Sequence, residues 1–249
     1  ISNATGQVGT WQLDSQSLPN SVYYAAAVEH EGALYVIGGA GDSVFDQVYY
    51  ATVQADGSLD PFIATSSLPE PLYDGLAIVY EGESFDTLYY IGGRNSITST
   101  FRVYFADFLP GGGLSAWQLS EGNLPGHIFG HDGTLLNGEI ILTGGIVDSI
   151  NPYVGISNTV EAALVDPGNP AFRLYDWCLG VPPPTCTIGA WQTGSLLPDV
   201  RARHGMASGH GYLYVLGGVD ATQYPRDTIY VGAVTGFGAR YSPEGYYLS

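Results

Sequence analysis

The residues best suited to chemistry in this chain are three arginines, an aspartate and a tyrosine close to glycine-rich stretches. They are Arg94, Arg201, Arg203, Asp74 and Tyr73. An arginine cluster beside an acid and a tyrosine nucleophile is a set that can hydrolyse acidic sugars, because the arginines bind the sugar carboxylate. The match is loose, so we predict no catalytic residues and keep a carbohydrate-active enzyme as the alternative.

The histidines do not form a recognisable catalytic or metal-binding pattern. They are His30, His127, His131, His204 and His210. Only His127 and His131 could meet across a turn, and we expect each imidazole to be satisfied within the fold or by water, with no metal site and no cofactor. Calcium binding between acidic loops, such as those of Asp42 and Asp46, is an alternative that stays open, although no ordered Asp-x-Asp-x-Asp run supports it.

Three further residue patterns bear on processing and compartment. Cys178 and Cys186 flank three consecutive prolines, so we expect an exposed loop closed by a disulfide between them. Such a disulfide would imply an oxidising compartment, and two free thiols are the alternative. Asn3 opens an Asn-Ala-Thr glycosylation sequon. Ser195 has neither a nucleophile elbow nor an assigned histidine, so hydrolase chemistry has no support there.

Four internal repeats position these residues. An apolar run ending in a glycine doublet recurs, and its copies are 34–39, 88–93, 140–145 and 213–218. A Leu-Pro pair precedes each doublet, beginning at Leu18, Leu68, Leu124 and Leu197. An aromatic residue stands six or seven positions before each pair, namely Trp11, Phe62, Trp117 and Trp191. Markers that keep their order four times indicate a repeat architecture.

Each repeat predicts four short strands and no helix. A small-residue strand comes first, the apolar strand with the doublet second, a segment rich in Val and Tyr third, and the strand with the aromatic residue last. Four-stranded units with a period of about 50 residues are typical of a β-propeller, in which blades pack face to face. We therefore predict an all-β fold, a β-propeller with four four-stranded blades.

The repeat resembles the kelch family, whose repeat has an apolar strand ending in Gly-Gly, then a tyrosine and a tryptophan. The resemblance covers roughly residues 9 to 234 and implies the propeller fold. The Arg and His that often open a kelch repeat are matched by Arg203 and His204 in the last copy, with His131 at the equivalent place in the third. The resemblance does not define one function, because kelch propellers include enzymes, actin-associated proteins and substrate adaptors.

The repeat markers also predict the blade boundaries. We expect a kelch-like propeller over residues 1–234, with blades at about 22–64, 74–119, 127–193 and 202–234, the last completed by 9–13. Residues 235–249 do not match the repeat and are expected to be a linker or tail. If residues 9–13 complete the last blade, the four blades close as a ring, and the alternative is an arc of a larger propeller.

The loops that enter the first strand and those that follow Gly-Gly should share one face of the propeller. The residues predicted for this ligand face are Tyr23, Tyr24, Tyr73, Asp74, Arg94, His127, Arg201, Arg203 and His204. Aromatic rings with Arg and Asp suit sugar or peptide recognition, because rings stack on apolar faces and planar charged groups make paired hydrogen bonds. Plain solvated loops are the alternative.

The net charge of the chain limits the classes of binding partner that it can have. The 249 residues include 24 acidic and 7 basic ones, all Arg, for a net charge of −17. Such a chain repels nucleic acid and anionic membrane surfaces, and it has no apolar run long enough to insert into a membrane.

We therefore predict a non-catalytic extracellular or cell-surface binding or structural module with a protein or carbohydrate ligand, and with neighbouring subunits or further domains as other partners. The alternatives are a sialidase- or sugar-epimerase-like enzyme and a structural subunit of a surface layer or filament.

Overall fold

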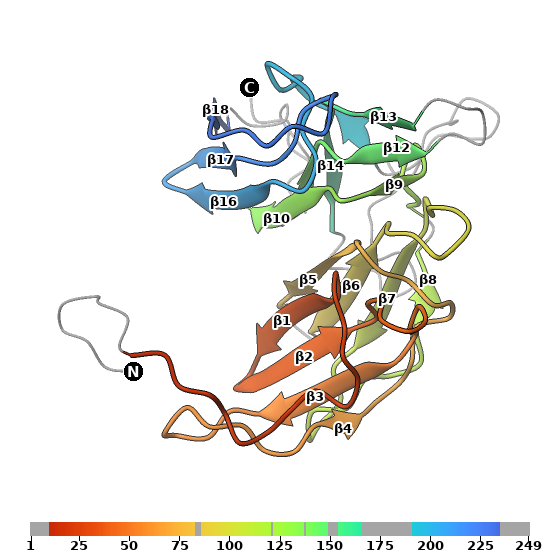
Figure 1. Cartoon of the computed structure of the whole chain (residues 1–249), viewed down its shortest axis with the longest axis vertical. Coiled ribbons are helices and arrows are strands. Elements are labelled where there is room, and N and C mark those ends of the chain that lie inside the picture. The colour runs from red at the N-terminus through yellow and green to blue at the C-terminus, as the bar shows by residue number, and fades with distance from the viewer. Residues whose placement is uncertain are drawn as a thin grey trace, which may run out of the picture. The chain divides into compact units, whose positions relative to one another are not determined.

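Short strands make up the regular structure of the chain in the computed structural model (Figure 1). The structure describes residues 10–82, 86–120, 122–136, 138–148, 154–165 and 191–234. Within these ranges it contains the strands β1 to β18 and no helix, so it offers no helix of the length and apolar character needed to cross a membrane. The chain divides into two compact units, residues 1–120 (unit 1) and 121–249 (unit 2), which are described separately.

Unit 1 contains two four-stranded antiparallel sheets, each running from inner to outer strand in chain order. The first blade consists of β1 (Ala26–His30), β2 (Ala33–Ile37), β3 (Val48–Thr52) and β4 (Ile63–Ala64). The second consists of β5 (Leu76–Tyr80), β6 (Thr87–Ile91), β7 (Val103–Asp107) and β8 (Gln118–Leu119). The first strands β1 and β5 lie side by side, so the two blades are neighbours within the unit.

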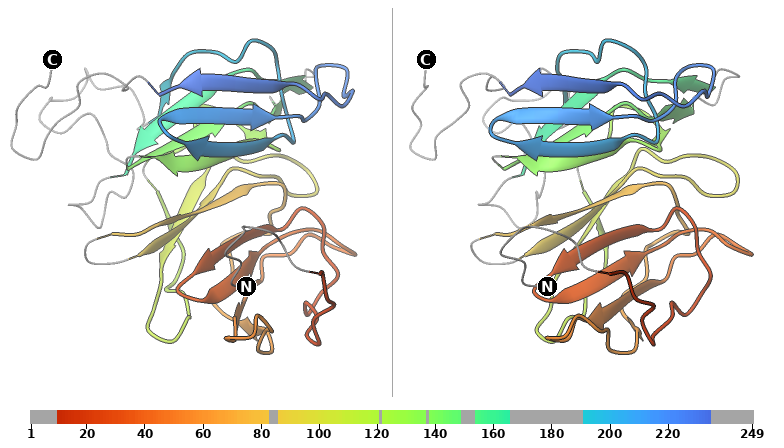
Figure 2. Two further views of the ribbon diagram at one scale, coloured as in Figure 1. Left: turned by 90° about the vertical axis from the view of Figure 1, so that its left-hand side faces the viewer. Right: turned by 60° about the vertical axis from the view of Figure 1, so that its left-hand side comes forward.

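Unit 2 repeats this arrangement (Figure 2). The third blade consists of β10 (Asp132–Leu136), β11 (Glu139–Thr143), β14 (Val160–Leu164) and β15 (Gln192–Thr193). The fourth consists of β16 (Gly205–Gly209), β17 (Tyr212–Leu216) and β18 (Ile229–Ala233). A small additional sheet has the order β13 (Val154–Ile156), β12 (Ile146–Asp148) and β9 (Ile128–Phe129), and among the described residues it has no counterpart in the other repeats.

Tight turns join the first two strands of several blades. Glu31 and Gly32 link β1 to β2 with φ of 45° and 76°, and His210 and Gly211 link β16 to β17 with φ of 53° and 80°. Two-residue turns with positive φ at both positions match the right-handed twist of the flanking strands, which is why hairpins favour them. A non-glycine residue at the first position is strained, and the glycine limits that strain to one residue.

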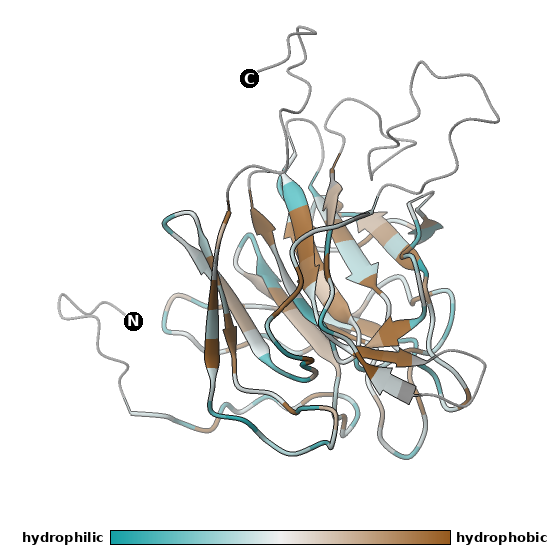
Figure 3. Cartoon of the chain, turned by 90° about the horizontal axis from the view of Figure 1, so that it is seen from above, coloured by the Kyte–Doolittle hydropathy of each residue, from teal (hydrophilic) through white to brown (hydrophobic). Residues whose placement is uncertain are grey.

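The cores lie where the second strands are covered on both faces. In β6, every residue from Thr87 to Ile91 is buried, and the core of unit 1 joins Tyr35 and Ile37 of β2 to Leu88 and Tyr90 of β6. In unit 2, Phe129, Ile146 and Ala202 form a small buried cluster. Hydropathy colouring places much of the apolar sequence on strands (Figure 3). The apolar runs before the first three glycine doublets are thus largely buried, as their composition predicts, whereas in β17, before the fourth doublet, Val215 alone is buried and Leu216 is 41% exposed.

The glycine doublets serve close approaches between neighbouring blades. Gly38 and Gly144, the first glycines of their doublets, both have a φ of 59°. A Cβ on Gly38 would lie 2.3 Å from the carbonyl oxygen of Leu72, and one on Gly144 would lie 2.2 Å from that of Arg201. A side chain at either position would therefore clash with the neighbouring blade and would also have to adopt a disfavoured φ.

The segment predicted to complete the last blade is not a strand where the structure describes it. Residues 10–13 form no strand, and Trp11 and Leu13 are 88% and 99% exposed. Among the described residues, β18 pairs with β17 alone. The pairing of residues 9–13 with the last blade therefore stays a prediction, as do the predicted blade boundaries.

Candidate ligand-binding site

The two loops at the open end of each blade are joined by short backbone bridges. The bridged pairs are Tyr23–Ala40, Tyr73–Arg94, Phe129–Ile146 and Ala202–Val219. Each pair joins the segment that enters the first strand to the segment that follows the glycine doublet. The expectation that these two loops lie together at one end of the blade is confirmed for all four repeats.

A residue with left-handed backbone conformation stands two positions before the first strand of every blade. These residues are Tyr24, Asp74, Gly130 and Arg203, with φ of 53°, 58°, 60° and 51°. In unit 1 the N–H of Asp74 donates to the carbonyl of Tyr24 at 2.9 Å, and in unit 2 the N–H of Arg203 donates to that of Gly130 at 2.7 Å. The same hydrogen bond thus links neighbouring blades in each unit and fixes the backbone positions from which these side chains extend.

Three tyrosines meet at this end of unit 1. The ring centroids of Tyr23 and Tyr24 are 5.3 Å apart with the rings at 78°, and Tyr73 lies 6.4 Å from each of them. Tyr23 and Tyr24 are 55% and 47% exposed, while Tyr73 is half-buried. Edge-to-face and stacked pairs at these separations are favourable, so the rings hold one another in a defined arrangement although they face solvent.

Arg94 supports this aromatic group from the loop after the second glycine doublet. Its guanidinium carbon lies 5.6 Å from the ring centroid of Tyr73, a cation–π distance. The two residues are also bridged through their backbones: the N–H of Tyr73 donates to the carbonyl of Arg94, and the reverse bond is formed too, both at 2.9 Å. We call Tyr23, Tyr24, Tyr73 and Arg94 the tyrosine surface.

The loop that leaves Arg94 presents an apolar residue that the sequence analysis did not select. Ile97 is 88% exposed at the tip of this loop. The Oδ1 of Asn95 accepts hydrogen bonds from the N–H groups of Ile97 and Thr98, at 2.8 and 2.9 Å, so the turn is held by its own side chain. An isoleucine between polar residues just after a glycine doublet was the signal available in the sequence.

The candidate residues of unit 2 do not form an equivalent group. Arg203 is exposed at the left-handed position, and His127 is half-buried beside a cavity of about 200 Å³ that Leu142 and Glu161 also line. Arg201 and His204 are both buried, with 1% and 6% of their surface exposed. The structure thus places two of the predicted ligand-face residues inside the unit rather than on its surface.

The guanidinium of Arg201 is used by the fold itself. It donates to the hydroxyl of Thr228 at 2.8 Å and to that of Tyr230 at 2.7 Å, and its carbon lies 5.0 Å over the Tyr230 ring. A further bond of 2.8 Å reaches the carbonyl of Val200. A planar group with five donors is suited to such a role, because it satisfies several acceptors while its face stacks on a ring. Arg201 therefore joins the loop that enters the fourth blade to β18.

His204 links the two blades of unit 2. Its Nε2 shares a hydrogen bond of 2.8 Å with the hydroxyl of Thr143, the last residue of β11. Burial lowers the pKa of His204 to about 4, and the positive charge of Arg201 adds to the effect. The imidazole is therefore neutral at physiological pH and serves as a packing and hydrogen-bonding group.

Some predicted features lie outside the residues that the structure describes. These are Asn3, Cys178, Cys186 and the tail 235–249. The glycosylation site, the disulfide and the linker therefore stay predictions.

The four repeated sheets define a β-propeller fold, and comparisons with known proteins agree with it. Over 95 residues the chain is 34% identical to Kelch-like protein 15 of Danio rerio, which is 38% of this chain and 14% of that protein. The chain thus spans about one seventh of that relative's length. The solved structure of YjhT matches 87% of this chain and 67% of its own, with a TM-score of 0.56 and 14% identity. No family model matches.

Proposed function

We propose that this chain is a non-catalytic protein-binding module and that a segment of a partner protein docks on the tyrosine surface. The observation that carries the proposal is the group of three tyrosine rings within 6.4 Å of one another, two of them exposed, with Arg94 against the third. Exposed aromatic rings that are already held in place lose little conformational entropy when a partner covers them.

The residue types support protein recognition. Tyrosine and arginine are enriched among the residues that dominate binding energy in protein interfaces. Arg94 contributes a planar guanidinium beside the rings, 5.6 Å from the ring centroid of Tyr73. The similarity to Kelch-like protein 15, 34% identity over 95 residues, adds support for a binding role.

The proposal includes an extracellular or cell-surface location, supported by the composition of the chain, which is acidic, has only 12% charged residues and lacks Lys. A sugar ligand is the rival on the same surface, because tyrosine rings also stack on the apolar faces of sugars. The enzyme alternative has less support, since the buried Arg201 is bonded to Thr228 and Tyr230 and does not present its guanidinium to a substrate.

The test is selection of a displayed library of linear 12-residue peptides on the intact chain, followed by affinity measurements on variants. Tyr23→Ser and Tyr73→Ser should each weaken the selected peptides at least tenfold, because each removes a ring from the contact area. Tyr224→Ser is the matched control, since Tyr224 is an exposed tyrosine of unit 2 outside the tyrosine surface.

Two results would contradict the proposal. One is a set of selected peptides whose affinities do not change with Tyr23→Ser or Tyr73→Ser. The other is an array of immobilised glycans on which the chain binds a sugar through the same two tyrosines while no peptide is selected at all.

A further inference from the structure

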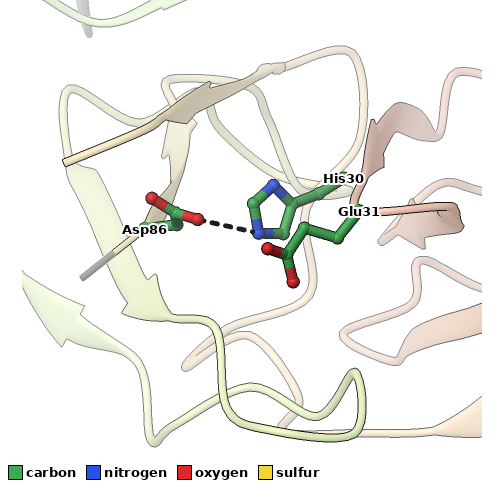
Figure 4. Close-up of side chains that lie close together, drawn as sticks. All are labelled: His30, Glu31 and Asp86. Carbon is green, nitrogen blue, oxygen red and sulfur yellow. Dashed lines mark ion pairs between the residues drawn. The ribbon is translucent and has the colours of Figure 1, made fainter. Parts of the chain in front are cut away.

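A histidine and two carboxylates meet at the opposite end of the blades of unit 1, at the turn between β1 and β2. They are His30, Glu31 and Asp86, and the sequence analysis assigned none of them to a site. One ligand atom from each residue lies within 4.8 Å of the other two, and His30 Nε2 is 3.3 Å from Asp86 Oδ2. Figure 4 shows the two carboxylates approaching the same side of the imidazole ring.

The fold brings these residues together from two neighbouring blades. His30 ends β1, and Glu31 occupies the first position of the tight turn, with a φ of 45°. Asp86 precedes β6, and its Oδ1 accepts the N–H of Gly82 at 3.1 Å. One carboxylate oxygen of Asp86 is thus held by its own hairpin, while the other faces the histidine.

Packing holds the imidazole ring of His30 in one orientation, with a ring nitrogen toward a carboxylate. The residue is 94% buried, with 6% of its surface exposed, and its ring lies on that of Phe108 with centroids 3.9 Å apart and planes at 31°. This contact fixes the ring plane, and Nε2 faces the carboxylate of Asp86 (Figure 4). An imidazole nitrogen with carboxylate oxygens beside it is a set of ligand types that zinc binds in proteins.

We propose that His30, Glu31 and Asp86 bind a divalent transition-metal ion of the zinc type. Two ligand atoms of a tetrahedral zinc site are separated by about 3.4 Å when each is about 2.1 Å from the metal. The His30–Asp86 distance of 3.3 Å already matches this separation, and the exposed Glu31 needs only side-chain rotation to complete three ligands. An imidazole ligand favours zinc, nickel or copper over calcium and magnesium, which prefer oxygen ligands alone.

The site would keep a coordination position open. A cavity of about 780 Å³ in unit 1 adjoins the three ligands and is also lined by Tyr35, Asp107 and Ser115. Three protein ligands beside such a space leave room for water or for a group from a bound molecule. The negative charge of the chain raises the local concentration of cations around it.

The test is a titration of the intact chain with zinc chloride, in which binding is measured by calorimetry and by competition with a chromophoric chelator. Cys178→Ser and Cys186→Ser are introduced throughout, so that thiols do not bind the metal. We expect saturable binding of one zinc ion per chain and a higher melting temperature with zinc. Cobalt in place of zinc should give visible absorption bands, a readout of nitrogen and oxygen coordination.

Variants separate this site from general surface binding. Asp86→Asn and His30→Gln should each weaken zinc binding at least tenfold, and Glu31→Gln several-fold. His210→Gln is the control, because His210 occupies the first turn position of the fourth blade, where Glu31 stands in the first, and it belongs to no three-residue group of metal ligands among the described residues; it should bind zinc as the parent does.

The proposal is overturned if zinc shows no saturable binding, or if Asp86→Asn and Glu31→Gln bind it as tightly as the parent protein. Because His30 is buried, His30→Gln could unfold the unit. The two carboxylate variants then decide, since neither side chain belongs to the buried core.

Discussion

The indole Nε1 of Trp117 donates a hydrogen bond of 2.9 Å to the carbonyl oxygen of Ser66. Trp191 repeats this contact in unit 2, where its Nε1 donates to the carbonyl of Gly122, also at 2.9 Å. Ser66 and Gly122 each lie two residues before a Leu-Pro pair. The tryptophan immediately before a blade's last strand therefore holds, by a hydrogen bond, the segment through which the chain enters that same blade.

Removing this hydrogen bond should destabilise unit 1 measurably. We expect Trp117→Phe to lower the free energy of unfolding by about 1 kcal/mol, because the Ser66 carbonyl loses its donor, and Trp117→Ala to lower it by about 3 kcal/mol through lost packing. Urea unfolding followed by circular dichroism measures both. Ile97→Ala, at an exposed apolar position, should change stability by less than about 0.5 kcal/mol. Equal stability of Trp117→Phe and the parent protein would contradict the assigned role.

Gly38, the first glycine of the first doublet, should resist substitution more than an ordinary turn glycine does. Gly38→Ala adds a Cβ that would lie 2.3 Å from the Leu72 carbonyl oxygen, so the blades must separate locally. We expect a loss of more than about 2 kcal/mol, above the roughly 1 kcal/mol that a positive φ alone costs.

Gly57→Ala is the matched control for this prediction, because Gly57 has a φ of +89° and nothing within 4 Å of its Cβ position. Thermal or urea unfolding compares the two. The same loss for both variants would mean that backbone strain, and not the close approach of the blades, sets the requirement for glycine.

Unit 2 should lose stability as the pH falls from neutral toward 5. Folding lowers the pKa of His204 from the usual 6.5 to about 4, so between these values the unfolded chain binds more protons than the folded one. Lowering the pH then favours unfolding, by roughly 2 kcal/mol between pH 7.5 and pH 5.

Comparison with His204→Gln isolates this effect, because glutamine can still bond to Thr143 but does not titrate. The urea midpoint of the parent should fall more over this pH range than that of the variant. Burial raises the pKa of Asp132 and of Glu161, which works in the opposite direction at lower pH, but both proteins share these groups. Parallel pH curves would rule out the role of His204.

The predicted closure of the last blade can be tested through its register. In the other blades the residue after the aromatic marker pairs with the third residue of the neighbouring strand, as Gln118 does with Phe105 and Gln192 with Ala162. By the same register, Gln12 is predicted to pair with Val231 and Leu13 with Tyr230.

A chain with Gln12→Cys and Val231→Cys, with Cys178 and Cys186 changed to Ser, should form an intramolecular disulfide under mild oxidation. Gln12→Cys with Ile229→Cys, two residues out of register, should do so far more slowly. Mass analysis of proteolytic fragments identifies the bond. Cross-linking between two chains instead would show that the segment completes a blade of a second copy.

Much of the fold could be predicted from the sequence because the same sequence markers recur in every repeat. The apolar run, the glycine doublet and the aromatic marker recur in order, and each corresponds to one strand or one close contact. The paired loops were predictable for the same reason. The strands β12 and β13 were not, because they occur in the third copy alone and no repetition marks them.

The individual site residues were harder to predict, because local sequence does not show which way a side chain turns. Arg201 and Arg203 stand two positions apart, yet one is buried against Tyr230 and the other is exposed. His30 and Asp86 are distant in sequence and meet only because β1 and β5 lie side by side. Neither relationship follows from spacing or composition.

The left-handed position before each first strand has an evolutionary consequence. It holds a tyrosine, an aspartate, a glycine and an arginine in the four repeats, with nearly the same backbone angle. The backbone link between neighbours uses main-chain atoms alone, so the side chain is not required by the architecture. Mutation at this position can therefore change what a blade recognises without changing how the blade folds, and a repeat duplicated during evolution would inherit a place at which new specificity can arise.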